Sequence, residues 1–280
     1  MKQPTTAQRV ILDKQVCSHA ATGKVPSSDW ADFCTCLRSG FVHCISPLVV
    51  VELLYGLYAG NDTHFRLNQD KLRHLFQASN ASIFLPLPGQ FLAKELFSVN
   101  RVLPSEVETD YELCLKLAIG AKDKQQILAG RLSPWGSDQQ YTLDLAKLAK
   151  EREAYLAKYI AYLEGFRSQG FRFKNERSWV AGALSHLGLP HTGENERTLL
   201  EGADAWYCFE KFIFTSVSGN YNFKKHTSDL VDGQMLQYLC DPSLFLVTSD
   251  ARLKKQILMC KQADRILTPK EFLSKFRMPI

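Results

Sequence analysis

The sequence predicts an α/β fold with a central parallel sheet, interrupted by a large and mostly helical insertion. Strand-like and helix-like segments alternate over residues 1–60 and again over residues 220–280. Such alternation is typical of parallel strands joined by crossover helices. Residues 61–219 instead show helical periodicity almost throughout, and this block is longer than the covering of a small sheet requires. We therefore expect one split core formed by the two ends, and a helical cap between them that packs in part on the core.

Four elements are expected in the first segment: a strand at 9–12 (RVIL), a helix at 27–40, a strand at 41–46 (FVHCIS) and a helix at 47–59. Ser27 or Ser28 is the expected N-cap of the first helix, because hydroxyl side chains bond the free N–H groups at a helix start. Ser46 and Pro47 predict the start of the second helix, since proline suits the first helical position. A parallel sheet of this kind places binding or catalytic groups at the carboxyl ends of its strands.

The insertion is predicted from the helical spacing of its apolar residues. Six helices are expected, at 68–79, 90–98, 105–121, 125–132, 142–167 and 198–217. In the longest, apolar residues recur every three or four positions. The last is rich in aromatic residues, so we expect it in the core.

After Gly219 the alternation of helix and strand returns. The expected elements are a helix around Asp232, a strand at 244–248 (LFLVT), a helix from Ala251, a strand at 265–268 (RILT) and a terminal helix at 269–276. They complete the second half of the predicted sheet.

Composition favours a globular protein, since 45% of the residues are hydrophobic and 22% are charged. The net charge of +5 permits an anionic partner without requiring one. The eight cysteines include no C-x-x-C pair, so we expect buried thiols in a reducing cytosol and no metal or disulfide framework. The polar amino terminus does not resemble a signal peptide, and the longest apolar stretch, 44–59, is too short to span a bilayer. We expect a cytoplasmic protein without membrane association.

Acidic residues stand where several of the predicted elements begin or end. Asp13 directly follows the first strand, and Asp250 follows the strand LFLVT. Asp229 and Asp232 are three residues apart at the start of a helix, so both project from the same face. Each acid has an ordinary explanation as a turn residue, an N-cap or a partner of the helix dipole. Their joint occurrence near the ends of parallel strands nevertheless favours a shared site.

Glu52 is informative because its helix is apolar on nearly every side. Three valines precede it and two leucines follow it in the run VVVELL. A lone buried carboxylate is costly, so we expect Glu52 to be neutralised, paired or bound to a metal.

Four segments, LDKQV, SPLVVVELL, SDLVDGQMLQYL and FLVTSDARL, resemble the PIN (PilT N-terminal) domain of metal-dependent nucleases. That family carries an Asp after its first strand, a Glu in a helix near residue fifty, an Asp opening a later helix and an Asp in a T-x-D turn. Asp13, Glu52, Asp232 and Asp250 match these positions in order. Asp229 is an extra acid on the same helix face as Asp232.

The resemblance implies a three-layer PIN-like domain whose catalytic residues are Asp13, Glu52, Asp232 and Asp250. These four and Asp229 would hold Mg²⁺ or Mn²⁺, which prefer carboxylate oxygens. Such ions hold a scissile phosphate and lower the pKa of an attacking water. Four basic residues are expected either to bind substrate phosphates or to be solvated surface charges: Lys14, Lys224, Lys225 and Arg252.

The leading interpretation is a metal-dependent endonuclease with RNA favoured over DNA, acting for instance as a toxin or defence effector under a regulatory protein or antitoxin. Lys14 and Gln15 stand where members of the family usually carry Ser or Thr and then Asn. A lysine there can occupy a cation position, which favours the alternative of a non-catalytic PIN-like module that binds RNA or a protein. A third interpretation is a helical interaction scaffold whose acids are purely structural.

Overall fold

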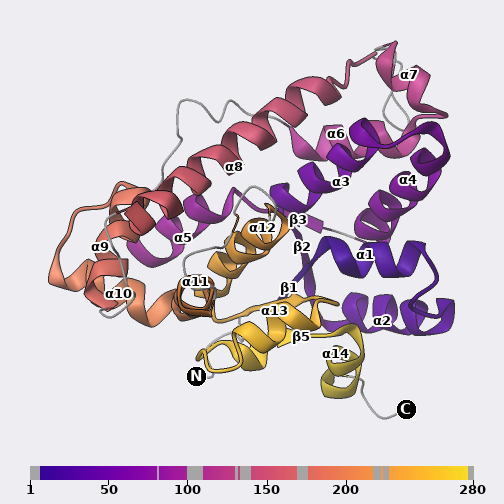
Figure 1. Ribbon diagram of the computed structural model, residues 1–280. Coiled ribbons are helices and arrows are strands. Elements are labelled where there is room, and N and C mark those ends of the chain that lie inside the picture. The colour runs from indigo at the N-terminus through magenta and orange to yellow at the C-terminus, as the bar shows by residue number, and fades with distance from the viewer. Residues whose placement is uncertain are drawn as a thin grey trace.

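Five parallel strands form a sheet at the centre of the molecule (Figure 1). The computed structural model describes residues 7–80, 82–99, 110–129, 132, 140–168, 176–216, 222 and 227–276. The strands are β1 (Arg9–Leu12), β2 (Val42–Ile45), β3 (Ser82–Phe84), β4 (Leu244–Val247) and β5 (Ile266–Leu267). Their order across the sheet is β3-β2-β1-β4-β5. The predicted α/β fold with a central parallel sheet is confirmed.

β1 is the middle strand, and it joins the two ends of the chain. Val10 lies opposite His43 of β2 on one side and opposite Phe245 of β4 on the other. Val10 and Ile11 have no exposed surface. Because parallel strands are covered on both faces, β1 is apolar at every position from Val10 to Leu12, without alternating polar residues.

Four helices lie in the first eighty residues: α1 (Lys14–Ala21), α2 (Ser27–Gly40), α3 (Pro47–Ala59) and α4 (Asp62–Gln77). α3 begins as predicted, because Ser46 Oγ accepts a hydrogen bond from the second helical N–H (3.2 Å) and Pro47 takes the first helical position. The N-cap predicted for α2 is wrong. Ser27 and Ser28 both lie inside the helix, and Pro26 precedes it without a side-chain cap.

β3 lies inside the range that was predicted to be helical. It pairs in parallel with β2, with Ser82 opposite His43. Three residues are too few to show strand periodicity in the sequence. The strand lies at the edge of the sheet, where Ile83 is 51% exposed. Residues 61–219 therefore contribute a strand to the sheet as well as helices.

The helices described between β3 and residue 216 are α5 (Pro88–Phe97), α6 (Tyr111–Gly120), α7 (Lys124–Leu128), α8 (Leu145–Ser168), α9 (Glu176–Leu187), α10 (Gly193–Gly202) and α11 (Asp204–Ser216). The single helix predicted at 198–217 is two helices, because the chain bends at Ala203. Gly202 sits against Leu96 of α5, where any side chain would overlap, so α10 ends in a close contact. The helix predicted at 105–121 is present as α6, and residues 101–109 lie outside the described residues.

The chain returns to the sheet through α12 (Thr227–Met235), the short 3-10 helix η1 (Leu236–Cys240), β4, α13 (Ala251–Gln256), η2 (Ala263–Arg265), β5 and α14 (Pro269–Phe276). α14 packs on α2, where the ring centroids of Phe33 and Phe272 lie 5.3 Å apart. Phe245 of β4 joins this aromatic cluster through Phe276, at 5.2 Å. The cluster covers the side of β4 on which Phe245 projects.

α8 links the helical block to the elements beside the sheet. It packs against α3 and also contacts α12. In Figure 1 it runs along the upper side of the molecule past α3. The block therefore touches helices from both ends of the chain, while the division into a split core (1–60 and 220–280) and a cap (61–219) stays a prediction.

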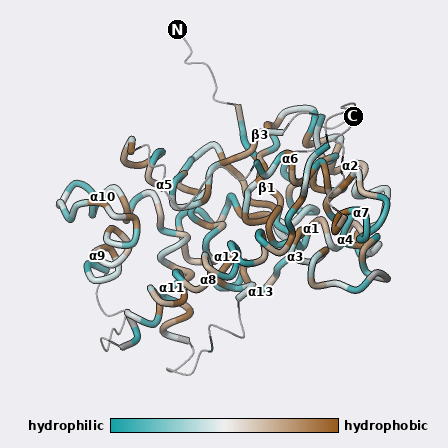
Figure 2. The backbone as a smooth tube through the Cα atoms, turned by 90° about the horizontal axis from the view of Figure 1, so that it is seen from above, coloured by the Kyte–Doolittle hydropathy of each residue, from teal (hydrophilic) through white to brown (hydrophobic). Residues whose placement is uncertain are grey.

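Apolar residues concentrate where the strands lie, and polar residues at the periphery, for example near α7 and α10 (Figure 2). All eight cysteines are free, and six of them are buried. The expectation of buried thiols is met by those six, and no disulfide forms. Within the described ranges, no helix is both long enough and apolar enough to cross a membrane.

Candidate functional site

The order in which the chain forms the strands reverses at β1. The chain passes from β1 to β2 on one side, whereas β4, on the other side, belongs to the distant C-terminal segment. In parallel sheets, ligands bind in the crevice outside the carboxyl ends of two such strands. Asp13 directly follows β1, and Asp250 lies three residues after the end of β4. We call this crevice the acid cleft, and its five acids are Asp13, Glu52, Asp229, Asp232 and Asp250.

Thr248 connects Asp13 to Asp250. Its hydroxyl donates to Asp13 Oδ2 (2.8 Å) and accepts from the backbone N–H of Asp250 (3.0 Å). Asp250 is also the N-cap of α13, since its Oδ1 accepts from two backbone N–H groups of that helix (2.7 and 3.0 Å). Its other oxygen accepts from Gln15 Nε2 (3.2 Å). Asp250 therefore serves the helix start and the acid cleft at once.

Asp13 and Asp232 are buried among like charges. Each has only 4% of its surface exposed. Burial raises the pKa of Asp232 well above its ordinary value, and the charges of the three neighbouring aspartates raise it further, with Lys14 offsetting part. Burial also raises the pKa of Asp13, although the hydrogen bond from Thr248 lowers it. The carboxylates repel one another, so added positive charge in the cleft is favourable.

The two acids of α12 differ in what they contact. Asp229 forms an ion pair with Arg252, whose side chain is 57% exposed. Asp232 instead interacts with the acids at the strand ends. A side chain at Gly233 would overlap the ring of Phe209, so this glycine lets α12 pack on α11. The close packing fixes the helix that carries Asp232.

Glu52 is held by two cations. Lys14 Nζ lies 3.0 Å from its Oε2, and Arg152 Nε contacts its Oε1. Burial alone would raise the pKa of Glu52, but the hydrogen bond and charge of Arg152 and the charge of Lys14 outweigh burial, and the pKa is lowered. Of the three outcomes expected for a buried carboxylate, the structure shows pairing.

Arg152 did not emerge from the sequence as a site residue. It lies on α8, separated from Glu52 by 100 positions, and it is one of several charged residues of that helix. Its guanidinium carbon also lies 4.3 Å from the ring centroid of Tyr55, a cation–π contact. The available signal was Glu52 itself, which required a cation without indicating which one.

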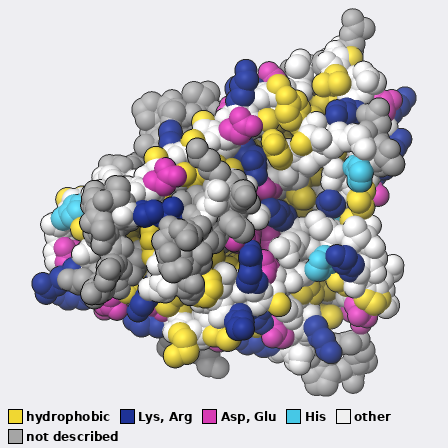
Figure 3. All heavy atoms as spheres, in the orientation of Figure 1, with side chains coloured by type: hydrophobic (Ala, Val, Ile, Leu, Met, Phe, Trp, Pro, Cys, Tyr) yellow, Lys and Arg dark blue, Asp and Glu magenta, His cyan; other side chains and the backbone are white. Residues whose placement is uncertain are grey.

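Lys14 brings a positive charge into the acid cleft. Burial lowers the pKa of its amine, but the charges of Glu52, Asp232 and Asp13 outweigh burial and raise it. The amine is therefore protonated at neutral pH and acts as a resident counter-ion. In Figure 3, acidic and basic side chains gather near the middle of this face, between α12 and α1.

The acid cleft fits a hard divalent cation in the type of its groups, and only partly in their arrangement. Asp13, Asp232 and Asp250 are buried oxygen donors of the kind that Mg²⁺ and Mn²⁺ prefer. Among the described residues, however, no three His, Cys, Asp or Glu side chains are already placed to hold an ion. Glu52 is engaged with two cations, so it becomes a ligand only if Lys14 moves away.

Two of the four residues expected to bind substrate, Lys224 and Lys225, lie outside the described residues. The other two are at the acid cleft, where Lys14 faces Glu52 and Arg252 faces Asp229. Their role in holding phosphates stays a prediction.

No protein-family model, curated protein or solved structure matches this chain. The resemblance to the PIN family rests on its four short segments alone.

Proposed function

We propose that this protein is a metal-dependent endonuclease that hydrolyses phosphodiester bonds, with RNA favoured over DNA as the PIN resemblance implies. The observation that carries the proposal is the convergence of Asp13, Asp232 and Asp250 at the carboxyl ends of β1 and β4. These acids come from separate elements, and their burial beside one another is unfavourable without a compensating cation. A bound cation would compensate this repulsion and would also contact a substrate phosphate.

The charge of the acid cleft suits one divalent ion. With its five acids ionised and its three cationic partners protonated, the cleft has a formal charge of −2. Asp13, Asp232 and Asp250 would hold the ion once their carboxylates move closer together, since they are not yet placed to do so. The bound ion would supply a water of lowered pKa and stabilise negative charge on the leaving oxygen. Lys14 already provides part of the charge that a second ion would bring.

The remaining residues of the acid cleft orient these groups and the substrate. Thr248 fixes one oxygen of Asp13, and Gln15 fixes one oxygen of Asp250. Lys14 is close enough to exchange Glu52 for a phosphate oxygen that enters the cleft. Arg252 exposes more than half of its side chain, so its guanidinium is accessible to a second phosphate.

A second function, non-catalytic binding of RNA or a protein, is favoured by one observation. The ammonium group of Lys14 occupies a cation position between Glu52 and the aspartates. If it stays there when substrate binds, the acid cleft binds without cleaving.

The test is cleavage of mixed RNA and DNA with Mn²⁺ or with EDTA, comparing wild type, Asp232→Asn and Asp264→Asn. Asp264 is the matched control, because it is exposed and precedes β5. It therefore lies at the amino-terminal ends of the parallel strands, whereas the acid cleft lies at their carboxyl ends. We expect wild type and Asp264→Asn to cut RNA with Mn²⁺, and Asp232→Asn to lose about 100-fold or more.

Cutting that persists in EDTA, or in both Asp232→Asn and Asp229→Asn, would contradict the proposal. Saturable RNA binding without cutting in Mg²⁺ or Mn²⁺ would favour the second function. If Asp229→Asn loses activity while Asp232→Asn keeps it, Asp229 is the third acid instead.

A further inference from the structure

A cavity of about 310 Å³ lies directly beside the acid cleft, among residues of α3, α5 and α8. Glu52 lines it from α3 and Val231 lines it from α12, next to Asp232. The cavity and the cleft therefore share a wall. A ligand bound in one is within reach of a group bound in the other.

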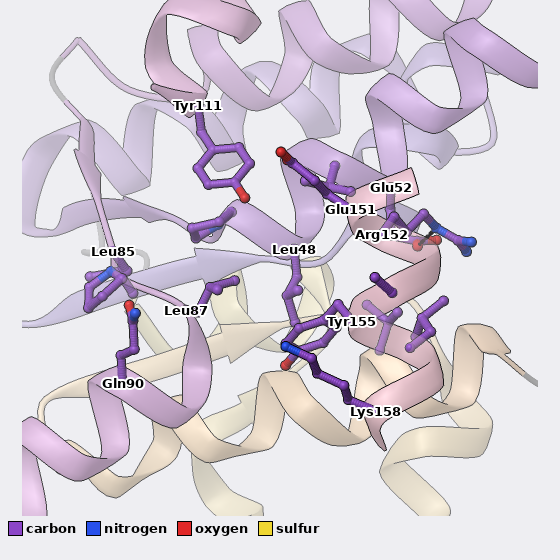
Figure 4. A pocket seen from close by; sticks show the side chains of 16 residues that line it. Leu48, Glu52, Leu85, Leu87, Gln90, Tyr111, Glu151, Arg152, Tyr155 and Lys158 are labelled. Carbon is purple, nitrogen blue, oxygen red and sulfur yellow. Dashed lines mark hydrogen bonds and ion pairs between the residues drawn. The ribbon is translucent and has the colours of Figure 1, made fainter. Parts of the chain in front are cut away.

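The cavity has an apolar interior and polar groups around it. Leu48 and Leu87 project into its centre in Figure 4, with the ring of Tyr111 on one side and Tyr155 on another. The amide of Gln90 lies at the end of the cavity away from Glu52. Along α8, Arg152 and Lys158 contribute positive charge and Glu151 contributes negative charge.

A second cavity, of about 250 Å³, adjoins the first and shares Leu87, Gln90, Tyr155 and Lys158 with it. Gln234 lines this second cavity, and only 2% of its surface is exposed. Its Oε1 accepts from Tyr155 Oη (2.8 Å) and from Gln237 Nε2 (2.9 Å). Its Nε2 has no partner within normal hydrogen-bond distance in the described part of the chain, although the amide also interacts with the hydroxyl of Tyr159. A buried N–H left unbonded is unfavourable, and a ligand carrying an acceptor would satisfy it.

We infer that these adjoining cavities take up one nucleobase of a single-stranded nucleic acid whose neighbouring phosphate lies in the acid cleft. The first cavity, at about 310 Å³, is at the small end of the range for ligand pockets, as a single base requires. Apolar and tyrosine surfaces suit the faces of a base, and the amides of Gln90 and Gln234 suit its edge. A base enters such a pocket only when it is unstacked, which selects single strands. This inference rests on the proposed function, because it places the scissile strand in the acid cleft.

The test blocks the first cavity without touching the acids. Ala154 lines the cavity and is itself exposed on α8, so Ala154→Trp fills the cavity without removing a core side chain. Ala157 is an exposed alanine on the same helix that does not line either cavity, so Ala157→Trp is the matched control. Both variants and wild type are titrated in EDTA with adenosine, guanosine, cytidine, uridine and inorganic phosphate, using ligand-observed NMR.

We expect wild type and Ala157→Trp to bind at least one nucleoside, and Ala154→Trp to bind it about tenfold more weakly or worse, a change of about 1.4 kcal/mol. Absence of nucleoside binding in wild type, or equal binding by Ala154→Trp, would overturn the inference. Binding of inorganic phosphate alone would overturn it as well, because no base is then recognised.

Cleavage separates this inference from the proposed function. If Asp232→Asn stops RNA cleavage while Ala154→Trp cuts the same positions at the wild-type rate, the nuclease function stands and the base pocket is wrong. If nucleosides bind in a manner that Ala154→Trp disrupts, yet no RNA is cut with any metal, the pocket stands and the nuclease function is wrong.

Discussion

Two regions of this protein bury carboxylates, and they compensate the charge in different ways. In the acid cleft, several carboxylates crowd together and face the cations Lys14, Arg152 and Arg252. In the helical block, Glu210 of α11 has no exposed surface, and the groups described around it are neutral hydrogen-bond donors.

Glu210 receives hydrogen bonds from three helices. Trp206 Nε1 donates at 2.7 Å and Trp179 Nε1 at 2.8 Å. Tyr162 Oη donates at 3.2 Å, and the hydroxyl of Tyr159 donates as well. These donors come from α8, α9 and α11, so one carboxylate ties three helices of the block together.

The difference between the two regions shows which buried acids are available to a ligand. Four fixed donors saturate Glu210, so it has no capacity left for a partner. Asp13 and Asp232 keep part of their mutual repulsion, because Lys14 offsets only some of it. Glu52 is balanced by side chains that can move. Removal of Glu210 should therefore destabilise the fold, whereas neutralisation of Asp232 in the acid cleft should stabilise it.

The largest effect is expected for Glu210→Leu. The change leaves four donors without their acceptor, and all of them except the half-buried Tyr162 are buried. Each unsatisfied buried donor costs about 1–3 kcal/mol, so we expect a loss on the order of 4 kcal/mol after partial relaxation. Urea denaturation measures this loss. Glu201→Leu, at an exposed glutamate on the neighbouring helix α10, is the control and should change little. A Glu210→Leu protein as stable as wild type would show that the four donors find water instead.

The ionisation of Glu210 should make the stability of the protein depend on pH. Burial raises the pKa of Glu210 from 4.5 to about 7, although its hydrogen bonds lower it. An acid whose pKa is higher in the folded state contributes fully below its unfolded pKa, and the contribution is lost as the pH rises through the folded value. The shift corresponds to up to about 3 kcal/mol between pH 4.5 and 7.

Glu210→Gln isolates this contribution, because the amide keeps an acceptor and does not ionise. The pKa values of Asp13 and Asp232 are raised in wild type and in Glu210→Gln alike, so their effect cancels when the two proteins are compared. Urea denaturation at pH 5 and pH 8 should show wild type losing more stability than Glu210→Gln. Equal losses would mean that Glu210 ionises in the folded protein as readily as in the unfolded one.

The strands on either side of the acid cleft could be predicted from sequence because they are short apolar runs followed by acids. Asp13 and Asp250 follow β1 and β4 as expected. β3 was not predicted, because three residues at a sheet edge carry too little pattern. Ser82–Phe84 is recognisable only through its pairing with β2.

The partners of the acids could not be predicted, because they are set by tertiary packing. Arg152 reaches Glu52 from a helix far along the chain, and nothing local distinguishes it from its charged neighbours. Glu210 was detectable in principle, since WYCFEKF places one carboxylate in an aromatic helix. The reasoning applied to Glu52 would have singled it out as a buried acid that needs partners.

The smallest expected effect, and the one opposite in sign, is for Asp232→Asn in the acid cleft. The folded pKa of Asp232 is raised, by burial first and then by its acidic neighbours, so its ionisation costs stability as the pH rises, and this cost persists at neutral pH. In EDTA at neutral pH, the variant should be more stable than wild type by about 1 kcal/mol. Excess Mn²⁺ should reverse the order, because an ion that binds only the folded state stabilises the protein that binds it better. Thermal melts of wild type, Asp232→Asn and the control Asp264→Asn, first in EDTA and then in excess Mn²⁺, test both expectations. If Asp232→Asn melts lower in EDTA and Mn²⁺ shifts none of the three, the acids of the cleft do not form a cation site, and the contrast with Glu210 is one of degree alone.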